Sequence, residues 1–221
     1  MKVWKTVLAT LVVSGLVIGL AAAGVVYSGA YNVGANAKHW PITHWVLTAA
    51  VHHSVEQHAA DIKAPELGSE QQLLAGAANF DAMCSGCHEP PGAKPSVAAQ
   101  GMYPRPPNLA HAGKEMSPGE IYWVIKNGIK ASGMPAWGAS HGDEEMWAMT
   151  AFIQQLPDMS KTDYDRLLMT AKADGIGHHD GESHEDGHGE AGHDDGDEHA
   201  DGGHNENPSQ SDSHDDAHAH G

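Results

Sequence analysis

The first apolar segment of the chain is long and uncharged. Residues Thr6–Tyr27 are 22 consecutive positions without a charged side chain, and Lys2 and Lys5 precede them. At about 1.5 Å per residue, a helix of this length crosses the roughly 30 Å hydrocarbon core of a bilayer. We therefore predict a transmembrane anchor in residues 1–30, with its basic end kept in the cytoplasm. The alternative is a cleaved signal peptide, whose apolar core is shorter, about 7–15 residues.

Helical periodicity continues in the next segment, residues 31–65. Apolar residues recur at positions i, i+3, i+4, i+7 and i+8, which predicts a helix from Ile42 to Ile62 with one apolar face. Pro65 is expected to end this helix. We interpret the segment as a juxtamembrane spacer helix, with Trp40 and Trp45 at the outer membrane interface.

A further helix is predicted immediately before the two cysteines of the chain. Ser69 and Gln72 have the spacing of a capping box, so a helix begins here and runs through Phe80. Gly76, Phe80 and Cys84 are spaced i, i+4 and i+8 and therefore share one helix face. A glycine on that face permits the close approach of a second helix, beside which the aromatic ring can pack.

Two more helices are predicted beyond a proline-rich loop. Ser117-Pro118-Gly119-Glu120 is a second capping box with proline at the first helical position, and it predicts a helix over 121–127 that Gly128 ends. Asp143 is the expected N-cap of a last long helix, 144–156, with one apolar face. No segment shows sustained alternation of apolar and polar residues, so the predicted fold class is all-α.

The candidate chemistry is concentrated in Cys84-Ser85-Gly86-Cys87-His88, which contains both cysteines of the chain. This is the spacing for covalent attachment of a c-type haem, in which two thiols bind the porphyrin and the adjacent imidazole ligates iron. A zinc site normally has four protein ligands, and the sequence has no second cysteine pair. A redox dithiol is expected beside a βαβ pattern, and a disulfide across so short a loop would stabilise little. The motif therefore favours one covalent haem.

A second axial ligand is expected from a methionine loop. Met134 lies between Gly133, which lets the backbone come close to the metal, and Pro135, which stiffens the loop. Other methionines compete for this role, as do His111 and His141. Ligation by two histidines would lower the reduction potential, because a thioether favours ferrous iron more than an imidazole does.

These features together resemble class I monohaem cytochromes c. The resemblance covers roughly residues 66–157, and its specific part is the haem motif Cys84–His88. Pro107-Asn108-Leu109 and Gly133-Met134-Pro135 also resemble family motifs. The spacer segment from Tyr31 to Trp40 is similar to that of proteobacterial membrane-anchored cytochromes.

The resemblance implies an all-α domain whose first and last helices cross, with Phe152 beside Gly76. It also implies a hydrogen bond from Nδ1 of His88 to the carbonyl of Pro107, which would fix the orientation of the imidazole. The residues implied to bind the haem are Cys84, Cys87, His88, Pro107 and Met134.

The composition changes abruptly after Ala173. Residues 174–221 hold fifteen acidic residues, ten histidines and no Lys or Arg, whereas the first 173 residues carry twelve basic and fourteen acidic residues. Almost no apolar residue is available to form a core, so the tail is predicted to be disordered. Its imidazoles and carboxylates are expected to bind Cu²⁺, Zn²⁺ or Ni²⁺, and the alternative is a solvated acidic tail. The histidines are His178, His179, His184, His188, His193, His199, His204, His214, His218 and His220.

The expected organisation is a class I cytochrome c fold with attachments at both ends. We place the anchor in residues 1–30, the spacer in 31–65, the monohaem domain with a helical extension from Ser160 in 66–173, and the tail in 174–221. The interpretation is an electron carrier, not an enzyme, anchored in the bacterial inner membrane with its haem domain in the periplasm. Its expected partners are redox donor and acceptor proteins and the membrane, with no nucleic acid.

Two alternatives remain open at this point. Within the same class, the chain would be the haem subunit of a respiratory oxidase or dehydrogenase complex. From another class, it would be a periplasmic Cu-, Zn- or Ni-binding protein whose haem serves as a redox sensor or as a reductant for the metal.

Overall fold

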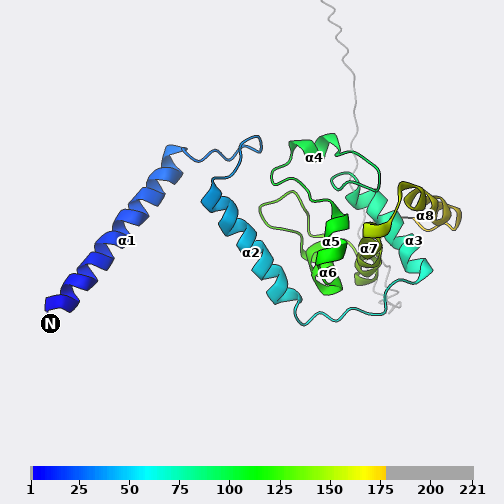
Figure 1. Cartoon of the computed structure of the whole chain (residues 1–221), viewed down its shortest axis with the longest axis horizontal. Coiled ribbons are helices and arrows are strands. Elements are labelled where there is room, and N and C mark those ends of the chain that lie inside the picture. The colour runs from blue at the N-terminus through cyan, green and yellow to red at the C-terminus, as the bar shows by residue number, and fades with distance from the viewer. Residues whose placement is uncertain (1, 178–221) are drawn as a thin grey trace, which may run out of the picture. The chain divides into compact units, whose positions relative to one another are not determined.

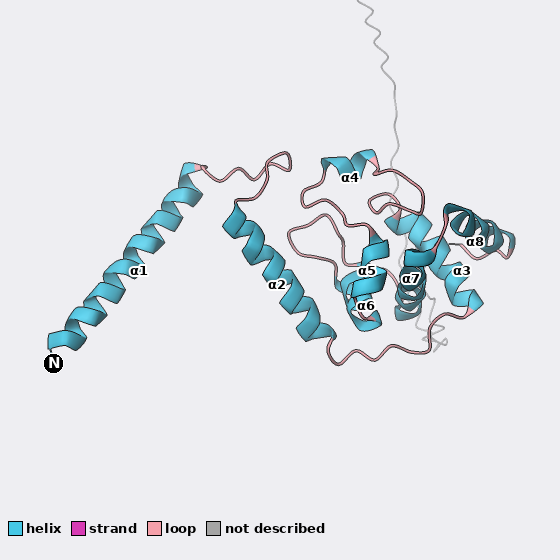
Figure 2. Cartoon of the chain, viewed as in Figure 1, coloured by secondary structure: helices cyan, strands magenta, loops and turns pink. Residues whose placement is uncertain are grey.

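The computed structural model describes residues 2–177, and all regular structure in that range is helical (Figures 1 and 2). The predicted all-α class is therefore confirmed for this part of the chain. The ten histidines of the predicted metal-binding tail lie outside the described residues. The α-helices are α1 (Lys2–Ser28), α2 (Pro41–Ala59), α3 (Glu70–Asn79), α4 (Val97–Gly101), α5 (Leu109–Glu115), α6 (Pro118–Asn127), α7 (Asp143–Gln155) and α8 (Lys161–Ala173). The shorter turns are a π-helix, η1 (Phe80–Cys84), and two 3₁₀ helices, η2 (Trp137–Ala139) and η3 (Leu156–Asp158).

Helix α1 matches the uncharged segment that opens the chain. Its residues Val3–Ser28 are long and apolar enough to cross a membrane, and none of them is buried against the rest of the described chain. A signal sequence near an N-terminus has the same length and composition, so α1 fits both alternatives that the sequence leaves open.

Helix α2 begins as expected but ends earlier than predicted. It stops at Ala59, and the backbone N–H of Ile62 donates to the carbonyl of Ala59 at 3.0 Å. Pro65 is therefore not the residue that ends this helix. The turn brings Ile62 over the start of α6, where a Cβ on Gly119 would lie 2.9 Å from the carbonyl oxygen of Ile62. Close packing against Gly119 explains why the chain leaves the helix before the proline.

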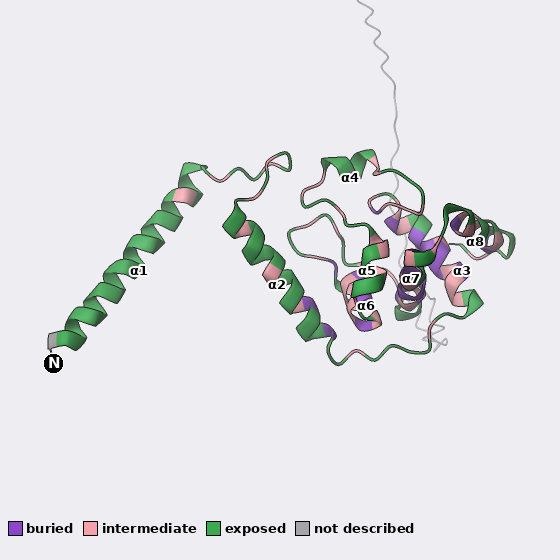
Figure 3. Ribbon diagram, viewed as in Figure 1, coloured by how far each residue is buried: buried purple, intermediate pink, exposed green. Residues whose placement is uncertain are grey.

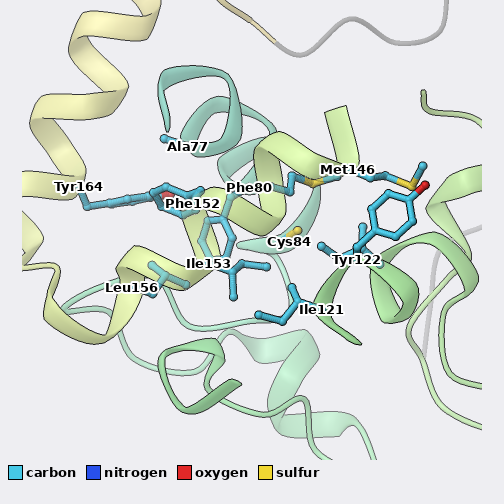
Figure 4. Packing of buried hydrophobic residues seen from close by; sticks show 12 residues of the cluster. Ala77, Phe80, Cys84, Ile121, Tyr122, Met146, Phe152, Ile153, Leu156 and Tyr164 are labelled. Atoms are coloured by element: carbon cyan, nitrogen blue, oxygen red, sulfur yellow. The ribbon is translucent and has the colours of Figure 1, made fainter. Parts of the chain in front are cut away.

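The core of the haem-motif region forms where α3 crosses α7. Gly76 faces the backbone of Ala148 so closely that a side chain at position 76 would overlap it, and Cβ of Phe152, one turn farther along α7, would lie 2.7 Å from the Cβ of such a side chain. Phe80 and Phe152 are both fully buried, with their ring centroids 5.1 Å apart (Figure 4). The predicted crossing at a glycine is confirmed.

Capping agrees with the sequence prediction at α6 and differs at α7. Ser117 and Glu120 form the expected capping box, and α6 ends at Gly128 with φ at 64°. The N-cap of α7 is Gly142 and not Asp143, which is the first helical residue. The Asp143 carboxylate instead accepts a 2.7 Å hydrogen bond from Lys126 of α6. That interaction occupies the side chain that was expected to cap the helix.

The loop after the haem motif contains two short helices, α4 and α5, that were not predicted from the sequence, because its prolines indicated an irregular loop. Ser96 caps α4 by accepting from the N–H of Ala99 at 3.0 Å, and Asn108 caps α5 by accepting from Ala110 at 2.9 Å. Helix α5 then packs on α7, since Gly113 lies against the carbonyl of Ile153.

The predicted helical extension, α8, packs on the same core as α3 and α7. Ser160 and Asp163 form its capping box. Tyr164 is buried, its ring lies 6.1 Å from that of Phe80, and its hydroxyl donates to the Asp81 carboxylate at 2.8 Å. Helix α8 therefore contributes to the packing of the domain.

Candidate cofactor-binding site

The two cysteines and the histidine of the motif lie on one tight turn at the end of the α3 helix. The π-helical turn closes when the N–H of Ser85 donates to the carbonyl of Phe80 at 2.9 Å. The carbonyl of Cys84 then accepts from both Cys87 at 3.0 Å and His88 at 2.8 Å. Turns of this π type are frequent at functional sites because they change the direction of the side chains that follow. Both thiols are free.

The environments of the two thiols differ. Cys84 is buried in the hydrophobic cluster, near Phe80 and Tyr122, whereas Cys87 is half-buried (Figure 4). Burial raises the pKa of the Cys84 thiol to about 12, and the neighbouring Cys87 adds to this effect. Redox-active or metal-binding cysteines normally have a lowered pKa, because the thiolate is the reactive form. Cys84 therefore does not have the electrostatics of a reactive thiol in a redox dithiol.

His88 is buried, and its imidazole is fixed from one side. Its Nδ1 lies 2.8 Å from the carbonyl oxygen of Pro107. A carbonyl can only accept a hydrogen bond, so Nδ1 carries the proton and Nε2 keeps a lone pair for a metal. Burial lowers the pKa of His88, with an opposing contribution from the Pro107 hydrogen bond, so the neutral form that can ligate is favoured.

The loop that carries Met134 is held by its own backbone. The N–H of Ile129 donates to the carbonyl of Met134 at 3.3 Å, and the N–H of Met134 donates to the Ser132 hydroxyl at 3.1 Å. Gly128 has φ at 64°, and a Cβ there would lie 2.7 Å from the carbonyl of Met134. The position therefore requires glycine for two reasons, its conformation and the close approach of the loop. Met134 itself is half-buried.

Among the competing methionines, the structure singles out Met102. A Cβ on Gly133 would lie 2.6 Å from Cε of Met102 and 3.4 Å from its Sδ, so this thioether packs directly beside the Met134 loop. Met146 and Met149 are fully buried in α7 and fill the core. From the sequence alone, Met102 is one of several methionines that could be the second axial ligand. Nothing in the neighbouring sequence indicates that the chain brings Met102 back to Gly133.

The two histidines that were alternative candidates for the second axial ligand, His111 and His141, have environments that differ from that of Met134. His111 is exposed on α5. His141 follows η2, where its Nδ1 lies 2.8 Å from the Ser140 hydroxyl and its ring meets Trp137 edge-on at 5.5 Å. Within residues 2–177 there is also no group of three or more His, Cys, Asp or Glu side chains that could hold a metal ion.

The donor set at the motif fits a covalently bound haem c. Two unpaired thiols, separated by two residues on one turn, provide attachment points, and the adjacent imidazole has its tautomer set by a backbone carbonyl. Burial of Cys84 beside aromatic residues supplies an apolar environment for one edge of a porphyrin. A structural zinc site would need further ligands that this part of the chain does not bring near the turn.

Comparison with known protein families finds a similarity over the helices that surround the motif. The model of the family "cytochrome c oxidase, cbb3-type, subunit III" matches residues 71–153. The matched range starts in α3 and ends in α7, and it contains Cys84–His88 and Met134. No match is found among curated proteins.

Proposed function

Because residues 71–153 form a class I c-type cytochrome domain, which carries electrons on covalently bound haem c, we propose that this protein is a membrane-anchored electron carrier with one haem. The observation that supports this most directly is the 2.8 Å contact between Nδ1 of His88 and the carbonyl of Pro107, beside two free thiols. We propose the same four-part division as above, with an anchor, a spacer, a haem domain that includes α8, and a tail.

Each residue of the site has a distinct role in this proposal. The thiols of Cys84 and Cys87 would hold the haem covalently, each adding across one vinyl group with its sulfur on one carbon and its hydrogen on the other, so that no oxidant would be consumed. Nε2 of His88 and the thioether of Met134 would hold the haem iron. The carbonyl of Pro107 orients the imidazole and increases its basicity. The bound haem supplies the redox chemistry, and the protein sets its potential through these ligands and through burial.

The anchor and its orientation belong to the same proposal. Helix α1 has the length and composition of a membrane span, and the positive residue Lys5 lies near its start. Positive residues stay on the cytoplasmic side, which puts the haem domain in the periplasm of a bacterial inner membrane. Carbonate washing of membranes should leave the protein in the pellet, and protease added to spheroplasts should cleave the haem domain. Release by carbonate would indicate cleavage of α1.

Visible spectra of the purified protein test the haem assignment. The colour should remain with the protein through acid-acetone extraction and denaturing electrophoresis, and Cys84→Ala with Cys87→Ala should abolish this retention. Oxidised protein should show a weak far-red sulfur-to-iron band that Met134→Ala removes. Met102→Ala is the matched control, since it removes the neighbouring thioether and should keep the band. Loss of the band in Met102→Ala and not in Met134→Ala would reverse the two roles.

A second candidate is supported by the family that matches residues 71–153, whose description names an oxidase subunit. In this alternative the chain delivers electrons as part of a terminal oxidase. Solubilisation in mild detergent followed by native electrophoresis separates the two proposals. A carrier should migrate apart from oxidase activity, whereas a subunit should migrate with it and with further haem-containing chains.

A further inference from the structure

The first half of α2 presents large apolar side chains to solvent. Ile42, Trp45 and Val46 are 62%, 65% and 48% exposed, respectively, and we call these three residues the α2 outer face. They belong to the apolar face that the periodicity predicts, but α6 does not cover it. Figure 3 shows α2 as mostly exposed, with burial confined to its last turns.

The outer face points away from the part of α2 that packs on the haem domain. The buried residues of α2 are Val55 and Ala59, at the end that meets α6. Val46 precedes Val55 by nine residues, which is two and a half turns, so the two side chains lie on opposite sides of the helix. Ile42 is one turn before Val46 and shares its side. Trp45 precedes Val55 by ten residues, so it projects from the flank of the helix, about 80° from Val55. The outer face is therefore centred away from the side that packs on α6, and the exposure of its three side chains shows that α6 does not cover them.

The apolar character of this side is confined to the start of the helix. Farther along the same side, His53 and Glu56 are largely exposed, and Nδ1 of His53 lies 3.6 Å from the Glu56 carboxylate. Between Lys38 and Glu56 the sequence has no Asp, Glu, Lys or Arg. The uncharged part is also where the tryptophans lie, since Trp40 is the N-cap of α2 and is 42% exposed. Tryptophan with aliphatic residues and no charge is typical of the membrane interface.

The chain between α1 and α2 is too short to take this face far from a membrane that α1 crosses. Only residues 29–40 connect the two helices. Twelve residues reach at most about 40 Å when fully extended. This linker is not extended, because Ala37 donates to the carbonyl of Gly34 at 2.9 Å and the Tyr31 hydroxyl lies 2.6 Å from Nδ1 of His39. Residue 41 must therefore remain close to the surface of the bilayer.

We propose that the α2 outer face binds in the interfacial region of the same bilayer that α1 crosses. This inference rests on the proposed membrane anchor. It places α2 between lipid on one side and the haem domain on the other. The end of α2 is attached to α6 by Val55 and Ala59 and by the ring contact of His58 with Trp123, whose centroids are 5.5 Å apart. The haem domain is consequently held at the membrane surface in a restricted orientation.

Site-specific photocrosslinking in the full-length, haem-loaded protein tests this inference. Benzoylphenylalanine replaces Trp45 in one variant and Met169, a 66% exposed residue of α8, in the matched control. Both positions are exposed, so neither replacement should disturb the fold, and the visible spectrum checks this. The proteins are reconstituted in phosphatidylethanolamine–phosphatidylglycerol vesicles and irradiated, and lipid adducts are measured by mass spectrometry. Position 45 should give at least about fivefold more lipid adduct than position 169.

Two results would overturn the inference, and they are distinguishable from failure of the anchor. Equal lipid labelling at both positions, in protein that resists carbonate extraction, would mean that α1 is anchored while the outer face is free in solution. Labelling of a second protein chain at position 45 in native membranes, with no lipid adduct there, would assign the face to a protein partner. Release of the protein by carbonate would remove the anchor proposal and this inference together.

Discussion

The apolar residues of α7 are buried, whereas those at the start of α2 are exposed. Phe152 and Met149 of α7 have no solvent-accessible surface, and Trp45 and Ile42 of α2 keep more than half of theirs. The two helices differ in whether another helix covers their apolar face. Helix α7 packs against α3 at Gly76, where the two backbones are in close contact. Helix α2 meets α6 only near its end. Apolar periodicity thus indicates that a helix face will be covered, but the covering surface can lie in the same domain or outside it.

The largest expected effect is the loss of the aromatic contact at the α3–α7 crossing. Phe152→Ala removes a fully buried ring that packs on Phe80 and Tyr164. The free energy of unfolding should fall by about 3–5 kcal/mol, the usual cost of a cavity of this size. Trp45→Ala is the matched control on α2 and should change it by less than about 0.5 kcal/mol in detergent. Denaturant unfolding followed by Soret absorbance measures both. Similar losses in the two variants would contradict the contrast between the helices.

A smaller effect is expected where α8 joins the core. Tyr164→Phe removes the hydroxyl that donates to Asp81 at 2.8 Å but keeps the ring. The free energy of unfolding should fall by about 0.5–1.5 kcal/mol, the net value of a typical hydrogen bond. Thr162→Ala, on the same helix, should have little effect. An unchanged stability in Tyr164→Phe would mean that α8 is attached by its apolar contacts alone.

The same tyrosine predicts a dependence of stability on alkaline pH. Burial, and then the hydrogen bond to Asp81, raise the pKa of Tyr164 above its ordinary value near 10. In the unfolded chain the hydroxyl ionises near pH 10, while in the folded protein it stays protonated. Its contribution is therefore fully present below pH 10 and is lost as the pH rises above it. The stability of the wild type should fall more steeply than that of Tyr164→Phe between pH 10 and 11, and parallel curves would contradict this.

The smallest expected effect on the haem domain comes from removing the tail. Truncation should be made after Gly177 rather than at Ala173, because the N–H of Ile176 donates to the carbonyl of Ala171 at 2.8 Å and closes the end of α8. The visible spectrum and the unfolding midpoint should not change. Calorimetric titration with Zn²⁺ or Cu²⁺ should show several weak sites in the full-length protein, weakening as the pH falls through about 6.5, and few after truncation. Equal uptake by both proteins would remove the tail from the metal hypothesis.

Much of this domain can be predicted from local signals alone. The capping boxes at Ser69 and Ser117 place the starts of α3 and α6, because the side chains that form them are neighbours in sequence. The i, i+4, i+8 spacing of Gly76, Phe80 and Cys84 predicts the face that α7 crosses. The spacing of Cys84–His88 predicts the cofactor, since the chemistry requires the thiols and the imidazole on one turn.

Features that depend on distant contacts could not be predicted. The end of α2 at Ala59 depends on Gly119, and the loss of Asp143 as a cap depends on Lys126, at least 17 residues away in each case. The position of Met102 beside Gly133 likewise depends on how the proline-rich loop folds back.

What the sequence determined by itself is the longer helices, the cofactor chemistry and the uncharged segment at the start, because each follows from residues within a few turns of one another. Only the tertiary structure decided which apolar faces are covered. Burial requires a second surface of matching shape, and α7 finds one in α3 at Gly76. The α2 outer face finds none among residues 2–177, because α2 packs on α6 only through its last turns, around Val55 and Ala59.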